Sequence, residues 1–362
     1  MEPYGRMERY PRRRQRQNLH LNRQMIFQAK SRRTAVAAGF LLLSAYALAA
    51  QEKPDRPPWA QPANSGQGRP GDAAQAKENS QESASPRGTI KVHVNLVNVL
   101  VSVLDEHNRP APNLPVEAFQ VFEEGVQQKI DVFESETQQP LDLALMIDAS
   151  LSAHKEMAFE RDAAAQFIKQ VLRPEDRMSV FYFDENVTQL AGFSGNVAAL
   201  QEAVRKIPDG GGTSIYDAIL LASHAMQARP SERRRVLVML TDAGETTSRA
   251  DFDTARKAAL RAEVLLYTIV VRPVKNENGR NTAGEHALQT ITETTGGAMF
   301  FPDSAQELPI IFDRIDQELR TQYRLAYYPN PRGPANTYRA IDVKVLPGYS
   351  ARHRTTYLTG LQ

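Results

Sequence analysis

The sequence predicts an α/β fold: a doubly wound, mostly parallel sheet, with a smaller β domain built from the flanking N- and C-terminal strands. Apolar runs of strand length alternate with amphipathic helical segments over residues 140–322, the pattern of parallel strands covered on both faces. Segments of alternating polarity precede and follow that region, which favours half-buried strands. The 362 residues include no cysteine, so burial rather than disulfides must stabilise these domains.

Residues 1–50 read as a secretory signal peptide or an N-terminal anchor. The apolar run 35–50 (AVAAGFLLLSAYALAA) follows basic residues and ends in an A-x-A pattern, which is typical of a signal cleaved after Ala49 or Ala50. An uncleaved anchor attached to a membrane remains the alternative. Either Met1 or Met25 could be the true start, since the second choice leaves a conventional signal. The protein is therefore expected to be exported to the periplasm, the cell envelope or the extracellular space.

The net charge of +2 conceals a strong asymmetry. Residues 1–33 carry ten basic and two acidic residues, which leaves 34 basic and 40 acidic residues for the rest of the chain. The body is thus acidic, which disfavours nucleic acid as a partner. Residues 51–88 are rich in Pro, Gln, Ser, Gly and Ala, and we expect a disordered linker there.

The β domain is expected to have an N-terminal part, 89–136, and a C-terminal part, 323–362. Alternation and β-branched residues predict strands in both parts. These strands are 90–104, 117–123 and 128–134 in the first part, and 323–329, 338–346 and 351–358 in the second.

The α/β domain is expected over residues 140–322, with helices between buried strands. The expected strands are 141–147, 178–183, 187–192, 235–241, 263–271 and 298–301. The expected helices are 156–172, 196–206, 214–228, 250–261, 283–295 and 304–321. On the first helix the apolar residues that should face the core are Phe159, Ala163, Phe167, Ile168, Val171 and Leu172.

Polar residues follow the strands where ligands of such sheets bind, at the carboxyl ends. Asp148, Ser150 and Ser152 come after the first α/β strand, and in an extended segment alternate residues point the same way. Thr213 lies in a Gly-rich loop before a helix, and Asp242 ends a later apolar strand. Hydroxyls with a few carboxylates suit a hard cation such as Mg²⁺. Alternatively, the first three residues cap the next helix or satisfy a turn.

D-x-S-x-S after a first apolar strand, Thr in a Gly-rich loop, and Asp after a later strand resemble the metal-ion-dependent adhesion site of von Willebrand factor type A (VWA) and integrin I domains. The resemblance covers about residues 140–322. It implies that Ser150 and Ser152 ligate the metal directly and Thr213 directly or through water. Asp148 and Asp242 would act through water or by orienting the ligands.

The flanks extend this resemblance to the exported VWFA-related family best represented in Acidobacteria, on the segments FQVFEEG, QKIDVF and YRLAYYP. Two positions depart from the usual pattern. Leu151 stands where the family has a glycine between the serines, and Ala243 where it has a glycine after the second acid. Both departures put the loop geometry and metal affinity in doubt.

The resemblance implies a binding module rather than an enzyme. Its Mg²⁺, or Mn²⁺ or Ca²⁺, would accept a carboxylate from an envelope or extracellular protein, for adhesion or protein–protein interaction. One alternative is a structural cell-envelope module in which the metal stabilises the fold. A metal-assisted hydrolase is less favoured, because no nucleophile, base and orienting group occur together in the sequence.

Overall fold

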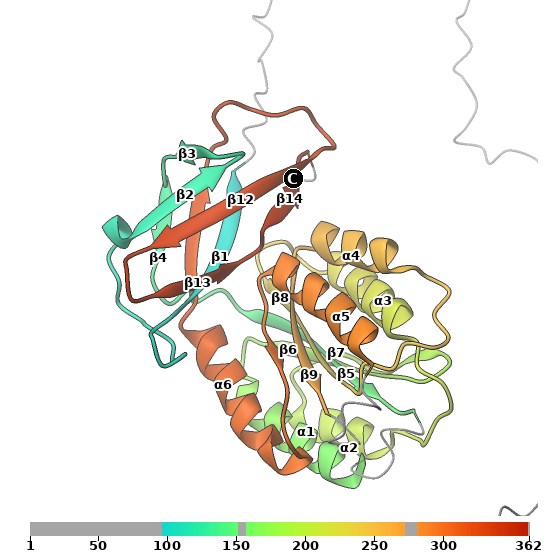
Figure 1. The fold of residues 1–362 in the computed structure, drawn as a ribbon. Coiled ribbons are helices and arrows are strands. Elements are labelled where there is room, and N and C mark those ends of the chain that lie inside the picture. The colour runs from blue at the N-terminus through green and yellow to red at the C-terminus, as the bar shows by residue number, and fades with distance from the viewer. Residues whose placement is uncertain (1–95, 151–156, 272–280, 361–362) are drawn as a thin grey trace, which may run out of the picture. The chain divides into compact units, whose positions relative to one another are not determined.

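A computed structural model describes residues 96–150, 157–271 and 281–360 (Figure 1). The predicted signal segment 35–50 and linker 51–88 lie outside this range, so both stay predictions, as do the predicted domain boundaries. In the part of the chain that is described, no helix combines the length and the apolarity needed to cross a membrane.

The α/β domain contains a six-stranded sheet. Its strands are β5 (Leu141–Asp148), β6 (Arg177–Phe183), β7 (Val187–Ser194), β8 (Arg234–Thr241), β9 (Val264–Val270) and β10 (Met299–Phe300). They lie in the order β10-β9-β8-β5-β6-β7. Only β7 runs antiparallel to its neighbour. The prediction of a doubly wound, mostly parallel sheet is therefore confirmed.

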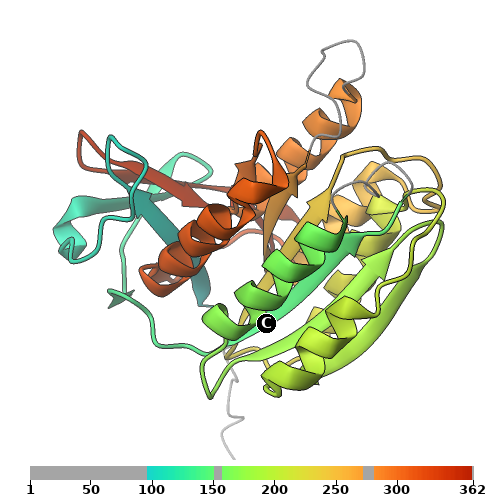
Figure 2. The same ribbon diagram turned by 90° about the horizontal axis from the view of Figure 1, so that it is seen from below.

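Helices cover both faces of this sheet. They are α1 (Met157–Val171), α2 (Val197–Arg205), α3 (Ile215–Gln227), α4 (Phe252–Arg261), α5 (Thr282–Thr295) and α6 (Leu308–Arg320). Successive residues of β5 point to opposite faces. Leu145 packs in a core with α1, α2 and α6, and Met146 in a core with α3, α4 and α5. Figure 2 shows α6 beside α1, where the rings of Phe312 and Phe167 stack at 4.4 Å.

The flanking strands form two four-stranded antiparallel sheets around one core. The strands are β1 (Val97–Leu104), β2 (Phe119–Glu123), β3 (Val126–Gln128), β4 (Val132–Glu134), β11 (Tyr323–Tyr327), β12 (Tyr338–Val345), β13 (Ser350–His353) and β14 (Thr356–Leu358). One sheet has the order β13-β1-β11-β4 and the other β14-β12-β2-β3. Each sheet thus contains two strands from the N-terminal part and two from the C-terminal part (Figure 1), which confirms the predicted β domain.

Two predicted strands are each divided in the structure. The predicted strand 128–134 contains the last residue of β3 and the whole of β4. These are separate strands because β3 pairs with β2, whereas β4 pairs with β11 in the other sheet. The segment 351–358 divides into β13 and β14 for the same reason. The alternation of polarity continues through both crossings, so the pattern alone did not reveal them.

One predicted core residue is wrong. Phe159 is 39% exposed on α1, although the apolar spacing placed it on the buried face. Met157 and Glu160 occupy the inward positions of the first turn instead. Two predicted segments also begin differently. Short 3-10 turns at Val116–Ala118 and Ala305–Glu307 precede β2 and α6.

Candidate metal centre

The candidate site lies where β5 and β8 end. The two strands are parallel neighbours, with Ile147 opposite Leu240. Asp148 is the last residue of β5, and Asp242 follows the last residue of β8. From β5 the chain passes to β6 on one side, whereas β8 lies on the other side. The site is therefore at the topological switch point of the sheet, where α/β folds bind ligands.

Asp148 is a buried carboxylate held by hydrogen bonds from two loops. It is 1% exposed. Its Oδ1 accepts from the Ser150 amide at 3.0 Å and its Oδ2 from the Thr241 hydroxyl at 2.7 Å. Burial raises the pKa of Asp148 to about 6, against the opposing effect of these hydrogen bonds, and the negative charge of Asp242 adds to the rise. The carboxylate thus lacks a countercharge.

The turn after β8 orients the second acid. Oδ1 of Asp242 accepts from the Gly244 amide at 2.9 Å. Ala243 adopts φ +65°, the left-handed conformation that favours glycine. This is one of the two positions where the sequence departs from the family pattern. A Cβ on Gly284, at the start of α5, would lie 2.1 Å from the carbonyl oxygen of Ala243, so α5 packs directly against this turn.

The Gly-rich loop reaches the first loop through its backbone. The Gly210 amide donates to the carbonyl of Ala149 at 2.7 Å. A Cβ on Gly210 would lie 2.4 Å from the Cβ of Asp184, so only glycine fits there without displacement. The loop ends at Thr213 and Ser214, and both are buried.

The segment after Asp242 clamps the Gly-rich loop. The Thr213 amide donates to Oγ1 of Thr246 at 2.8 Å, and the Thr246 amide donates back to the Thr213 carbonyl at 2.9 Å. Oε2 of Glu245 accepts from the Ile215 amide at 2.7 Å and from the Tyr216 amide at 3.3 Å. A carboxylate at the N-terminus of α3 complements the helix dipole.

Of the five predicted ligands, four lie in the described part of the chain. Asp148, Ser150 and Thr213 are buried, at 1%, 2% and 3% exposure, whereas Asp242 is partly exposed. Hydrogen bonds connect their loops in pairs: Thr241 with Asp148, Gly210 with Ala149, and Thr246 with Thr213. Ser152 lies outside the described residues.

Sequence reasoning missed the residues that hold these loops together, namely Thr241, Glu245 and Thr246. The run Glu245-Thr246-Thr247-Ser248, which begins three residues after the second acid, was the available signal. The described residues include no cluster of three or more His, Cys, Asp or Glu side chains that could hold a metal. A cation here would thus depend on hydroxyl and water oxygens beside two carboxylates, a donor set that suits Mg²⁺.

The fold and site define an α/β domain with a polar site at the carboxyl edge of its sheet. Residues 143–245 match the family model of the von Willebrand factor type A domain, and this range includes Asp148, Ser150, Ser152, Thr213 and Asp242. The chain therefore contains a VWA domain. None of the curated proteins matches the chain significantly.

Several solved structures are similar in fold. The conserved hypothetical protein BatB from Bacteroides thetaiotaomicron is 16% identical, over 49% of this chain and 98% of that chain, with a TM-score of 0.40. A von Willebrand factor type A protein from Catenulispora acidiphila is 13% identical, over 67% and 74%, with a TM-score of 0.45. The pilus adhesin SpaC from Lactobacillus rhamnosus GG is 10% identical, over 70% and 48%, with a TM-score of 0.43. Similarity this remote carries no functional argument.

Proposed function

We propose that the VWA domain binds one divalent cation, in the first instance Mg²⁺, and uses it to capture a carboxylate of a partner protein. Ser150, Ser152 and Thr213 would supply oxygen ligands. Asp148 and Asp242 would hold metal-bound waters or orient the hydroxyls. The bound cation would supply an electrophilic position for the partner's carboxylate. The partner would be an envelope or extracellular protein, and the chain would be exported through its N-terminal segment.

The observation that carries this proposal is the environment of Asp148. A carboxylate at 1% exposure, with another acid close enough to raise its pKa, is costly without a cation nearby. The hydrogen bonds on Asp148 come from two neutral residues, Thr241 and Ser150, so neither supplies a countercharge. A bound Mg²⁺ would supply it.

The arrangement of the loops also supports a ligand site. Glycine is required at Gly210, where a side chain would collide with Asp184, and Ala243 keeps a left-handed conformation that costs an L residue about 1 kcal/mol or more. Local strain that persists in a structure often serves a functional site. The match of residues 143–245 to the VWA family supports the same function, and we further propose that the chain belongs to the exported VWFA-related group.

Calorimetric titration of the chelator-treated protein with Mg²⁺ tests the metal site. We expect saturable binding at one site, which Asp242→Ala and Ser150→Ala weaken by at least tenfold. Asp303→Ala, which removes an exposed carboxylate on the loop before α6, is the matched control and should bind like the wild type. Equal affinities in all four proteins would refute the metal site.

Capture of a carboxylate needs a second measurement. Arrays of peptides that each contain one Glu, beside the same peptides with Gln, are probed with and without EDTA. Binding to Glu peptides alone, and only with Mg²⁺ present, is expected. If Mg²⁺ raises the melting temperature but no peptide binds in a metal-dependent way, the fold-stabilising role replaces the capture role.

A further inference from the structure

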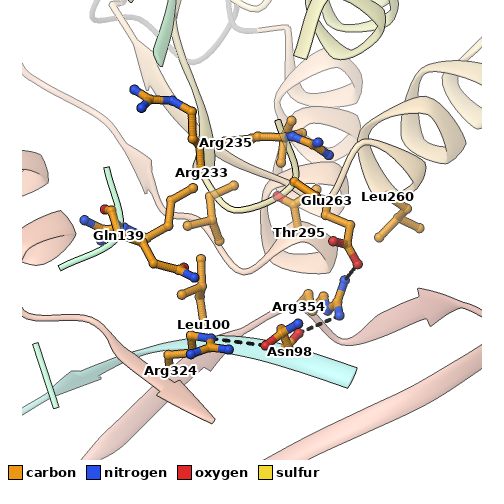
Figure 3. A pocket seen from close by; sticks show the side chains of 14 residues that line it. Asn98, Leu100, Gln139, Arg233, Arg235, Leu260, Glu263, Thr295, Arg324 and Arg354 are labelled. Carbon is orange, nitrogen blue, oxygen red and sulfur yellow. Dashed lines mark hydrogen bonds and ion pairs between the residues drawn. The ribbon is translucent and has the colours of Figure 1, made fainter. Parts of the chain in front are cut away.

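A cavity of about 90 Å³ lies at the opposite edge of the sheet. It is bounded by the amino ends of β8 and β9 in the α/β domain, and by β1, β11 and the segment after β13 in the β domain. Its charged residues are Arg233, Arg234, Arg235, Glu263, Arg324 and Arg354. We call this cavity the arginine cleft. Figure 3 shows Arg233 and Arg235 on one side of it, and Arg324 and Arg354 on the other.

The carboxylates around the cleft do not neutralise its cations. Glu263 pairs with Arg354 at 2.6 Å, and Glu134, outside the lining, pairs with Arg324. Asp142 pairs with Arg233 at 2.7 Å and is shared with Arg229. The five lining arginines thus form ion pairs with three carboxylates, one of which also serves a sixth arginine. The charges of Asp176 and Glu232 act on Arg234 and Arg235 as well, so five carboxylates are set against six arginines. An excess of positive charge remains.

Two guanidinium nitrogens of the lining have unused hydrogen-bonding capacity. Nε of Arg235 and Nε of Arg354 are buried without an acceptor. The other nitrogens of Arg235 donate to the carbonyls of Ala262 and Arg229, at 2.9 and 2.8 Å. Buried donors in native proteins are almost always satisfied by protein, water or an ion. Two of the lining arginines thus have a buried donor that no group of the described residues satisfies.

Burial also affects the ionisation of the arginines that the α/β domain contributes to the cleft. Burial lowers the pKa of Arg234 to about 10 and lowers the pKa of Arg235 as well. In each case burial outweighs the neighbouring acids. An anion in the cleft would restore the balance.

We propose that the arginine cleft binds a small organic anion through a phosphate or carboxylate group. Guanidinium groups present planar, paired donors that match these oxyanions. Leu100, Leu260 and Leu265 line the same cavity and would contact the apolar part of the ligand. Because the arginines come from both domains, the anion would join the β domain to the VWA domain at the edge of the sheet remote from the metal site.

The test is calorimetric titration with two probes, inorganic phosphate and succinate, at constant ionic strength adjusted with NaCl. Saturable binding of at least one probe is expected, and the tighter one identifies the oxyanion class. Arg235→Gln and Arg324→Gln remove one donor group from each wall and should weaken binding about tenfold. Arg205→Gln removes an exposed cation of α2, with 55% side-chain exposure, and should change nothing. EDTA should also leave binding unchanged, because this site is separate from the metal site.

Three results would overturn the proposal: no saturable binding of either probe, equal weakening by Arg205→Gln, or unchanged affinity in Arg324→Gln. Arg235 also binds the carbonyl that ends α4, so Arg235→Gln could unfold the protein. Arg324→Gln then decides the question alone, because the guanidinium of Arg324 hydrogen-bonds only with Asn98 and the partly exposed Glu134 among the described residues.

Discussion

Thr241 and Asp148 meet at 2.7 Å, hydroxyl to carboxylate, at the ends of two neighbouring parallel strands. The Thr241 hydroxyl in turn accepts from the Ala243 amide at 3.1 Å. The orientation of Asp148 is thereby linked to the turn that carries Asp242. The two acids of the candidate site are therefore positioned by one connected set of hydrogen bonds.

The raised pKa of Asp148 predicts a pH dependence of stability in the metal-free protein. In the native state the carboxyl keeps its proton up to about pH 6, whereas the unfolded chain releases it near the ordinary value of about 4. The native state thus binds more protons between these values, and the free energy of unfolding falls as pH rises through that window. The loss amounts to about 3 kcal/mol. Urea unfolding in EDTA at several pH values measures it.

Asp148→Asn is the control for this measurement, since it keeps the shape of the side chain and removes the titration. Subtracting its curve isolates the contribution of Asp148 from those of other carboxylates. If the two curves run parallel from pH 4 to 6.5, Asp148 is not a carboxyl of raised pKa.

Gly210→Ala should disturb the Gly-rich loop, because the new Cβ would lie 2.4 Å from the Cβ of Asp184 and 3.0 Å from the carbonyl oxygen of Ala149. We expect a loss of unfolding free energy of about 1–3 kcal/mol and weaker Mg²⁺ binding. Gly192→Ala is the matched control, because a Cβ at Gly192 meets no atom within 4 Å. Denaturant unfolding of both variants makes the comparison, and similar losses would contradict the crowding at Gly210.

Ala243→Gly should stabilise the protein. Ala243 adopts φ +65°, and glycine takes this conformation without the steric cost that an L side chain has there. After allowing for the greater entropy of glycine in the unfolded chain, the gain should be about 0.5–1 kcal/mol. Ala225→Gly, inside α3, should instead destabilise by about 1 kcal/mol. Thermal melts that show losses in both variants would argue against the left-handed turn.

Glu245→Gln should loosen the start of α3. The carboxylate accepts from the Ile215 and Tyr216 amides and from the Ser248 hydroxyl, and the amide side chain loses its charge toward the helix N-terminus. We expect a loss of about 1 kcal/mol of unfolding free energy and weaker Mg²⁺ binding, because Thr213 lies two residues before the helix. Glu202→Gln, on an exposed position of α2, should leave both quantities unchanged. Loss of stability without loss of Mg²⁺ affinity would separate Glu245 from the site.

The α/β domain was predictable because its strands are continuous apolar runs and its helices have clear amphipathic faces. The β domain was predictable in composition but not in connectivity. The chain passes from one sheet to the other at residues 129–131 and again at residues 354–355. The periodicity of apolar residues does not indicate which sheet a strand joins. Phe159 was misplaced because it lies at the flank of the buried stripe, where spacing alone does not decide exposure.

At the candidate site the acids and hydroxyls were predictable, since they follow strands whose ends meet in any parallel sheet. The supporting contacts were not. Glu245 caps a helix that begins 30 residues earlier in the chain, and such a relationship exists only in three dimensions. The arginine cleft was missed for a similar reason. The run Arg233-Arg234-Arg235 is visible in the sequence, but Arg324 and Arg354 join it only through folding.

The VWA domain leaves the β domain after β4 and returns in β11, and these two strands are hydrogen-bonded neighbours, with Glu134 opposite Arg324. Strand β1 is likewise bonded directly to β13. If the protein is pulled at Val97 and Leu358, we therefore expect the hydrogen bonds between strands of the small sheets to bear the force. The VWA domain lies outside this path, so the loops of the candidate site should bear no tension until the strands of the small sheets separate.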